Sequence, residues 1–175
     1  MPYSKKSIIR KLKETFGYND FRPNQLEAIT TVLNGKDAFV MMATGSGKSI
    51  CYQLPSVVTK GVTVVISPLI SLMEDQVQAL NAISVPATFL GTAQKDKSVK
   101  TKILRGEYRL VYMTPERIST DIDLLLDIYD ATGSLTAIAI DESHCISEWG
   151  HDFRASYRNM KRIRNNATLK DVPII

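Results

Sequence analysis

The sequence predicts an α/β fold, in which a mostly parallel sheet carries helices on both faces. Two observations lead to this prediction. Short apolar runs alternate with longer amphipathic segments, a pattern typical of βαβ units. One of these runs, 62–67, is rich in β-branched residues, as expected of a strand buried on both faces. The 175 residues suffice for one domain, residues 1–175, with a leading helix over 1–16.

The helices are predicted from apolar positions three and four residues apart. This spacing defines a first helix that begins near Ser4 and ends before Gly17. Pro23 suits the first position of a second helix, which ends at about Leu33. The same spacing predicts further helices directly after residue 49 and over 69–83, 95–104, 124–129 and 154–164.

The strands are predicted from apolar runs that polar or glycine-rich loops follow. These runs are 38–42, 62–67, 87–90, 109–113, 135–140 and a last one that begins at 172. Loops that begin at Ala43, Ser67, Thr114 and Asp141 follow four of the strands directly. Because the carboxyl ends of parallel strands share one edge of a sheet, these loops are expected to lie along that edge.

The composition indicates an ordinary globular protein with an uneven charge distribution. Apolar residues make up 44% and charged residues 23%, and no segment is long and apolar enough to span a membrane. A cytosolic or nuclear protein without a membrane partner is therefore expected. The net charge is +4, with basic residues concentrated over 5–13 and 154–170. These clusters suggest a polyanionic partner, although charge runs alone also fit a solvated helix face.

A glycine-rich loop, Ala43-Thr44-Gly45-Ser46-Gly47-Lys48-Ser49, predicts a phosphate-binding site. Gly45 and Gly47 allow successive backbone N–H groups to turn toward a phosphate, and the following helix points its positive end at the same place. Lys48 can reach the terminal phosphates, and the Ser49 hydroxyl is a suitable Mg²⁺ ligand. The alternative is a flexible loop that binds nothing, which the flanking strand and helix signals disfavour.

Asp141 and Glu142 form an acidic pair at the end of an apolar strand. One carboxylate of such a pair can hold Mg²⁺ while the other orients and deprotonates a water molecule. The alternative is a charged strand end at the surface. His144 follows closely, and a relay role is favoured for it because Mg²⁺ prefers oxygen ligands.

Three residues upstream of the glycine-rich loop could bind a base. Tyr18 and Arg22 can stack on a flat ring, and the amide of Gln25 carries the donor and acceptor that an adenine edge requires. Their alternative is an ordinary polar surface, but their place just before the loop favours the base.

The loop over 145–154 contains the only tryptophan of the chain. Trp149 and Phe153 could stack on unpaired bases, and Arg154 could contact phosphate. The aromatic rings could equally fill the core, and the residues alone do not decide. The two cysteines, Cys51 and Cys145, lack metal-ligand spacing and are expected to be reduced thiols.

Taken together, these motifs resemble the first RecA-like lobe of RecQ-family DNA helicases in superfamily 2. Met42, where the general phosphate-loop pattern has glycine, already points toward helicases. The string Cys145 to Arg154 is the most specific motif, and 89–94 looks most like the Werner-syndrome helicase branch. The resemblance extends from about residue 16 to 175 and is carried by the motifs at 16–25, 43–49, 67–77, 112–117, 141–144 and 145–154.

The resemblance implies a RecA-like P-loop NTPase lobe that uses ATP and Mg²⁺ to unwind DNA with 3′-to-5′ polarity. It implies a role in DNA repair or recombination, single-stranded and duplex DNA as partners, and a nuclear location if the source is eukaryotic or a cytoplasmic one otherwise. By this resemblance, Tyr18, Arg22 and Gln25 would bind adenine, and residues 44–49, with Lys48 among them, would bind the phosphates. Ser49 and Asp141 would hold Mg²⁺, Glu142 would be the base and His144 the relay. DNA would be contacted by Trp149, Phe153 and Arg154.

Two features depart from the family pattern. Ser143 stands where the motif at 141–144 usually has alanine in this family, and this change in side-chain size is small. The second lobe, with its arginine finger, is not within these residues. Because such an arginine is worth about 10³–10⁵ in rate, these residues alone are expected to bind nucleotide weakly and to hydrolyse it poorly. The competing hypotheses are a DEAD-box RNA helicase lobe, which would have Asp at position 144, and a DNA-binding scaffold without motor function, which intact Lys48 argues against.

Overall fold

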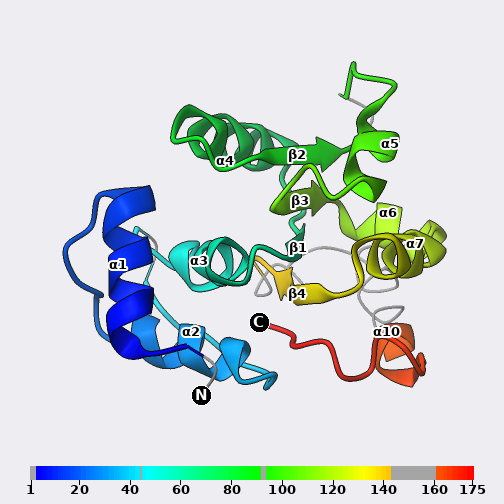
Figure 1. The fold of residues 1–175 in the computed structure, drawn as a ribbon. Helices are drawn as coiled ribbons and strands as arrows, with labels where there is room; N and C mark the ends of the chain where they lie inside the picture. Colours follow the sequence, from blue (N-terminus) through cyan, green and yellow to red (C-terminus); the bar gives the residue numbers. More distant parts are fainter. Residues whose placement is uncertain (1–2, 44, 92–93, 143–160) are drawn as a thin grey trace.

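A parallel four-stranded sheet forms the centre of the molecule, in the order β2-β3-β1-β4. The structure, a computed structural model, describes residues 3–43, 45–91, 94–142 and 161–175. Figure 1 shows the sheet between two groups of helices. The strands are β1 (Val62–Ile66), β2 (Ala87–Leu90), β3 (Leu110–Met113) and β4 (Leu135–Ile140).

Helices cover both faces of this sheet, as the sequence predicts. Their bounds are α1 (Lys5–Phe16), α2 (Gln25–Leu33), α3 (Ile50–Thr59), α4 (Ile70–Ala82), α5 (Val99–Leu104), α6 (Pro115–Thr120), α7 (Asp123–Thr132) and α10 (Lys161–Asn165). Successive strand residues point to opposite faces, so the strands feed two separate hydrophobic clusters. Val65 and Tyr112 pack with α3 and α4, whereas Val64 and Val111 pack with α5, α6, α7 and α10.

A third cluster attaches the N-terminal helices to the rest of the fold. Ile8 and Leu12 of α1 and Ile29 of α2 pack on Ile50 and Leu54 of α3, and all five are buried. Ser4 caps α1 by accepting a hydrogen bond from Ser7 N, and Gly17 ends it with a φ of 75°. This packing fixes the start of α2 next to the glycine-rich loop, which precedes α3.

The prediction of a strand over 38–42 is wrong, because the structure has no strand in these described residues. Among the described residues, one backbone hydrogen bond joins this run to the sheet region, from Ala38 N to Ile174 O at 2.9 Å. A strand needs consecutive ladder bonds, and this run has a single one. Phe39 and Met41 are 84% and 81% exposed, so they do not enter the core. The strand expected from 172 is shorter than predicted: its last residues pair with β4 through one bridge, between Ile138 and Ile174, and three backbone hydrogen bonds.

Other boundaries differ less. The second helix begins at Gln25 rather than Pro23, because Asn24 takes a left-handed conformation, with a φ of 69°. α5 covers only the second half of the helix expected over 95–104, and α6 was not expected. α10 overlaps the end of the basic helix expected over 154–164 and extends one residue beyond it, and residues 154–160 are outside the described part of the chain. No helix among the described residues is long and apolar enough to cross a membrane.

Candidate functional site

The carboxyl edge of the sheet brings together segments that are distant in sequence. Ser67 N donates to Met113 O at 3.0 Å, and Asp141 N donates to Ile66 O at 2.9 Å. The residues that follow β1, β3 and β4 therefore lie side by side, as predicted from the parallel topology. Asp141 is placed at this edge because the β4 backbone remains paired with β1 up to Ile140.

The start of α2 holds the glycine-rich loop through two backbone carbonyls. Arg22 Nη1 donates to Gly45 O at 2.8 Å, and Gln25 Nε2 donates to Gly47 O at 2.9 Å. The Gln25 amide oxygen also accepts from Arg22 N at 2.8 Å. Both ends of this buried amide are therefore engaged within the protein. Gln25 keeps its second N–H and one lone pair of its amide oxygen for a base in this arrangement.

Both glycines of the loop have a backbone conformation that favours glycine, and Gly47 also lacks space for a side chain. Gly45 and Gly47 have φ values of 76° and 86°, which other residues rarely adopt. A Cβ at Gly47 would also lie 2.7 Å from Gln25 Nε2, whereas a Cβ at Gly45 would meet nothing within 4 Å. The close approach of Gln25 to the loop thus depends on the missing side chain at Gly47.

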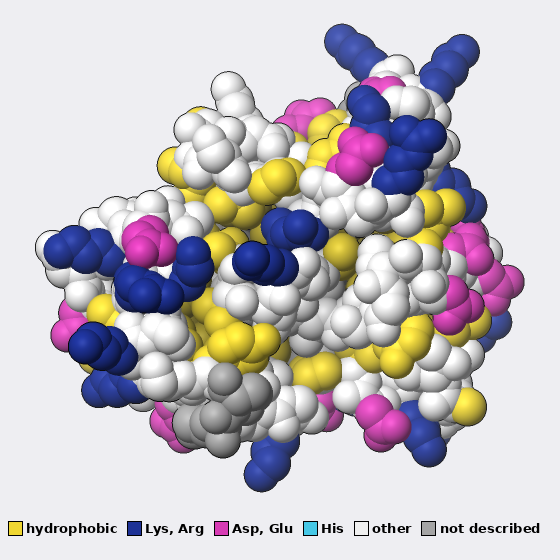
Figure 2. Space-filling view, viewed as in Figure 1, with side chains coloured by type: hydrophobic (Ala, Val, Ile, Leu, Met, Phe, Trp, Pro, Cys, Tyr) yellow, Lys and Arg dark blue, Asp and Glu magenta, His cyan; other side chains and the backbone are white. Residues whose placement is uncertain are grey.

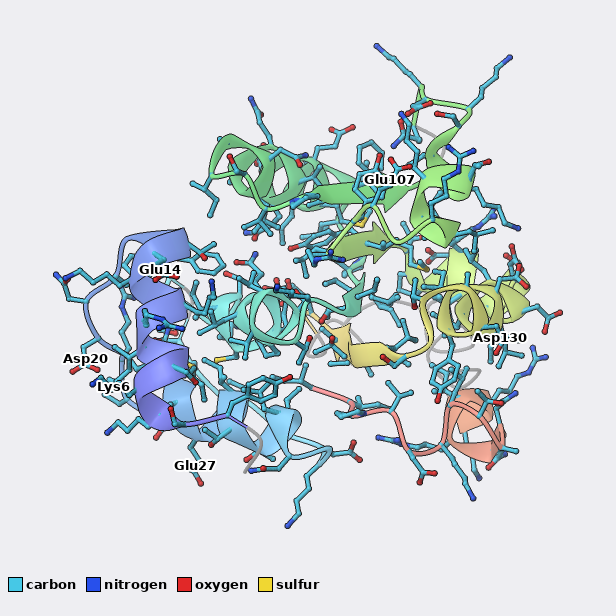
Figure 3. The ribbon with its side chains drawn as sticks, in the orientation of Figure 1. Lys6, Glu14, Asp20, Glu27, Glu107 and Asp130 are labelled. Atoms are coloured by element: carbon cyan, nitrogen blue, oxygen red, sulfur yellow. The ribbon has the colours of Figure 1, made fainter. Side chains whose placement is uncertain are left out.

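A cavity of about 350 Å³ lies between this loop and α4. Tyr18, Arg22 and Gln25 line it together with Gly47 and Ser49. The three candidate base-binding residues and the phosphate loop therefore share one cavity. Tyr18 is 54% exposed, so its ring is accessible at this site. Asp20, which the sequence did not single out, also lines the cavity, and Figure 3 shows it in the connection between α1 and α2.

A second cavity, of about 660 Å³, contains the acidic pair. Lys48, Asp141 and Glu142 line it, together with apolar residues of the 38–42 run and of the C-terminal segment. Lys48 is close enough to Asp141 to favour its charged form. The lysine and both carboxylates therefore meet in one cavity, whereas Ser49 lines the neighbouring one. Ser46 is turned back into the loop, where its hydroxyl donates to Ala43 O.

Asp141 is held from two sides. Tyr52 OH donates to Asp141 Oδ2 at 3.1 Å, and Glu142 N donates to Asp141 Oδ1 at 3.0 Å. Burial raises the pKa of Asp141 above its ordinary value, and the hydrogen bond from Tyr52 opposes this rise. Glu142 has a φ of 53°, an uncommon conformation for a non-glycine residue, which is found mostly where other contacts impose it.

The donors at this edge fit Mg²⁺ bound together with a nucleotide. The side chains are a hydroxyl and carboxylates, the hard oxygen ligands that Mg²⁺ prefers. Among the described residues, no group of three or more His, Cys, Asp and Glu side chains gathers as a metal site. Mg²⁺ is usually held by one or two carboxylates and by substrate phosphates, so this sparse set suits it.

Several predicted site residues cannot be placed, and one functional candidate was missed. Thr44, His144, Trp149, Phe153 and Arg154 lie outside the described residues. Tyr52 was missed because its role depends on a contact with a residue 89 positions away. The only local signal is its place in the helix after the loop, three residues beyond Ser49.

Basic side chains of the first cluster, and those around α5, are partly neutralised by acidic neighbours. Glu14 pairs with Arg10 and Lys11, and Asp96 pairs with Lys102. Figure 2 shows Lys and Arg side chains over α1 and around α5, with acidic side chains among them. This face therefore carries no continuous basic surface among its described residues. Arg164 of α10 is also structural, since it donates to the carbonyls of Lys170 and Val172.

Comparison with known proteins identifies this arrangement. The fold is that of a RecA-like lobe: a hypothetical ATP-dependent RNA helicase from Sulfolobus tokodaii shares it with a TM-score of 0.64 at 21% identity, over 98% of this chain and 50% of that one. Residues 22–174 match the DEAD/DEAH box helicase family, and the chain belongs to this family.

Its relatives are RecQ-type helicases. The ATP-dependent DNA helicase RecQ of Haemophilus influenzae is 45% identical over 98% of this chain, and the bifunctional 3′-5′ exonuclease/ATP-dependent helicase WRN of mouse is 47% identical over 100% of it. RecQ-like DNA helicase BLM of Xenopus laevis is 40% identical over 99%. The resemblance to RecQ helicases is thereby confirmed. The chain spans only 27%, 12% and 13% of the lengths of these three relatives.

Proposed function

We propose that this chain is the ATP-binding lobe of a DNA helicase that moves 3′ to 5′ along single-stranded DNA and unwinds duplexes. The observation that carries the proposal is the meeting of Lys48, Asp141 and Glu142 in one cavity beside the glycine-rich loop. Several relatives are named ATP-dependent DNA helicases, which supports the same activity. A role in DNA repair or recombination follows from the same kinship, and with it a nuclear location if the source is eukaryotic.

The described geometry supports a division of roles among the site residues. Tyr18 and Arg22 would bind the adenine, and Gln25 would contribute its remaining N–H. The backbone of Thr44 to Gly47 and the Lys48 ammonium would bind the phosphates, because N–H donors and a cation stabilise their charge. Mg²⁺, when bound, supplies positive charge at the same phosphates. Ser49 and Asp141 would hold it, and Glu142 would take a proton from the attacking water.

The open cavity around Asp141 also supports a second lobe as partner. Its wall includes the apolar 38–42 run, whose Phe39 and Met41 are largely exposed, and an exposed apolar surface next to a charged site is typical of an interface. Since the relatives are several times longer than this chain, we propose that a second RecA-like lobe covers this cavity and supplies the arginine finger. Four further residues, His144, Trp149, Phe153 and Arg154, would connect the site to DNA.

Replacement of Lys48 tests the proposal. In a protein that contains both lobes, Lys48→Ala should abolish ATP hydrolysis and unwinding, while Lys60→Ala, an exposed lysine at the end of α3, should leave both unchanged. Unwinding by the Lys48→Ala protein would disprove the motor function.

Trp149→Ala should uncouple DNA binding from hydrolysis and leave ATP binding intact. Unfolding of this variant would instead assign Trp149 to the core.

A further inference from the structure

The buried tyrosine next to the acidic pair carries an inference that rests on the proposed function. Tyr52 is 5% exposed, and its ring packs in the cluster between α3 and the sheet. Its hydroxyl reaches Asp141 Oδ2 at 3.1 Å from the third position of α3. Helix α3 begins directly after the glycine-rich loop, so one rigid element carries both the loop's last residues and the hydrogen-bond donor to Asp141.

The Tyr52 hydroxyl lies beside a second buried hydroxyl group. It interacts with the hydroxyl of Tyr112 on β3. Gln53 Nε2 donates to the Tyr112 hydroxyl at 3.2 Å and to Gln76 Oε1 of α4 at 2.7 Å. Tyr112 and Gln53 are 1% and 5% exposed. Because buried polar groups of this kind are costly to leave unpaired, the Tyr52 hydroxyl has few other positions available to it.

These contacts determine which lone pairs of the Asp141 carboxylate remain available to a ligand. Tyr52 occupies one lone pair of Oδ2, and the backbone of Glu142 occupies one of Oδ1. A carboxylate oxygen has two lone pairs, so each keeps one acceptor site. Since each oxygen is bonded to a different group, rotation of the carboxylate about its Cβ–Cγ bond would break one or both bonds.

We propose that Tyr52 is a positioning residue, which fixes the Asp141 carboxylate for the Mg²⁺ that accompanies the nucleotide. Tyr52 does not contact the metal or the phosphates in this role. It fixes the orientation of the ligand, as outer hydrogen-bond partners of metal ligands commonly do. The Tyr112 hydroxyl interacts with that of Tyr52, and Gln53 donates to Tyr112, so both would contribute indirectly.

Mn²⁺ binding, followed by electron paramagnetic resonance with and without the non-hydrolysable nucleotide AMP-PNP, tests this role. Loss of an outer hydrogen-bond partner typically weakens metal affinity about 10–100-fold. Tyr52→Phe should therefore weaken nucleotide-dependent Mn²⁺ binding by about 10-fold, while the affinity for metal-free nucleotide stays unchanged. Tyr112→Phe, which leaves the bond to Asp141 in place, should weaken it less. Tyr129→Phe is the matched control, since this half-buried tyrosine of α7 packs on the opposite face of the sheet.

Three results would overturn the inference. Unchanged Mn²⁺ affinity in Tyr52→Phe would show that the hydroxyl does not position Asp141. An equal loss of metal-free nucleotide affinity would show that Tyr52 only maintains the fold of the site. If Tyr52→Phe does not fold, full Mn²⁺ affinity in Tyr112→Phe decides against it. Absence of nucleotide-dependent Mn²⁺ binding in an unmodified protein that contains both lobes would instead refute the proposed function itself.

Discussion

The side-chain amide of Gln25 donates a hydrogen bond of 2.9 Å to the carbonyl oxygen of Gly47. This bond ties the first residue of α2 to the turn that precedes α3. It is possible because Gly47 has no Cβ, since a Cβ there would lie 2.7 Å from the amide nitrogen. Gln25 is thus part of the support of the glycine-rich loop, whatever it contributes to a bound base.

Alanine substitutions at the two glycines should therefore differ in cost. Gly45→Ala imposes a left-handed backbone on a residue with a Cβ, which costs about 1–2 kcal/mol. Gly47→Ala imposes the same strain and also displaces Gln25 from its bonds to Gly47 O and Arg22 N, at about 1 kcal/mol for each lost bond. Urea unfolding of both variants measures the difference in the free energy of unfolding. In a Gln25→Ala background the difference should vanish, and its persistence would mean that another contact excludes the Cβ.

The attachment of the C-terminal segment depends on Asp37. Its Oδ1 accepts from Ile174 N at 2.8 Å and from the Arg164 guanidinium. Asp37→Ala should lower the free energy of unfolding by about 1 kcal/mol, since the pair is half exposed and such pairs are weak. Asp171→Ala, an exposed acid nearby in the sequence of the same segment, should have little effect. Equal losses in the two variants would indicate a general charge effect instead of this bond.

The ion pair between Asp96 and Lys102 should make the free energy of unfolding depend on pH in the acidic range. Lys102 first, and Ser98 second, lower the pKa of Asp96 from 3.8 to about 2 through hydrogen bonds. A lowered carboxyl pKa stabilises the fold above the unfolded value, and this contribution disappears as the pH falls from about 4 to about 2. The stability advantage of the unmodified protein over Lys102→Met should therefore shrink across that range.

Thermal unfolding of the two proteins between pH 6 and pH 2 measures this trend. Lys100→Met serves as control, because Lys100 lies 3.8 Å from Asp127 in an exposed pair. Its difference from the unmodified protein should stay small at every pH. A constant difference for Lys102→Met would show that Lys102 acts by packing alone.

Sequence patterns predicted the sheet and its edge well, because they depend on local composition. The run at β4 is apolar except for Thr136 and is followed by Asp141, so both the strand and the place of the acid followed from the pattern. The same reasoning failed for the 38–42 run. Its composition is that of a strand, but strand formation needs a partner with consecutive hydrogen bonds, and Ala38 alone finds one in Ile174 among the described residues.

The sequence predicted where the candidate residues of the site lie, but it did not predict the contacts that they make. Lys48, Asp141 and Glu142 follow from short motifs, and they line one cavity as expected. The engagement of Gln25 with Gly47, and of Tyr52 with Asp141, joins residues 22 and 89 positions apart. Such pairs depend on the packing of α2 and α3 against the sheet, about which a single sequence without homologues contains no direct signal.

Cys51 should be unreactive in the folded protein. Burial raises the pKa of its thiol to about 11, and the side chain is 1% exposed. At pH 8 only about a thousandth of such thiols would be ionised, and the thiolate is the reactive form. A Cys145→Ser variant isolates Cys51 for titration with a disulfide reagent. Its thiol should react slowly in buffer and rapidly in denaturant, and a fast reaction in buffer would mean that the start of α3 opens readily.

The hydrogen bonds of Gln53 should contribute strongly to the packing of α3 against α4 and β3. Its amide nitrogen donates both to Gln76 and to the Tyr112 hydroxyl, so one substitution removes two bonds. Gln53→Met preserves the volume and leaves the buried Tyr112 hydroxyl without this donor, at a cost of about 1–3 kcal/mol. Gln76→Met should cost less, because Gln76 is half-buried and water can replace its partner. In a double-mutant cycle measured by urea unfolding, the second substitution should add little to Gln53→Met, since the bond between them is already lost. Full additivity would show that the two amides act independently and that α4 is held to α3 by its apolar contacts alone.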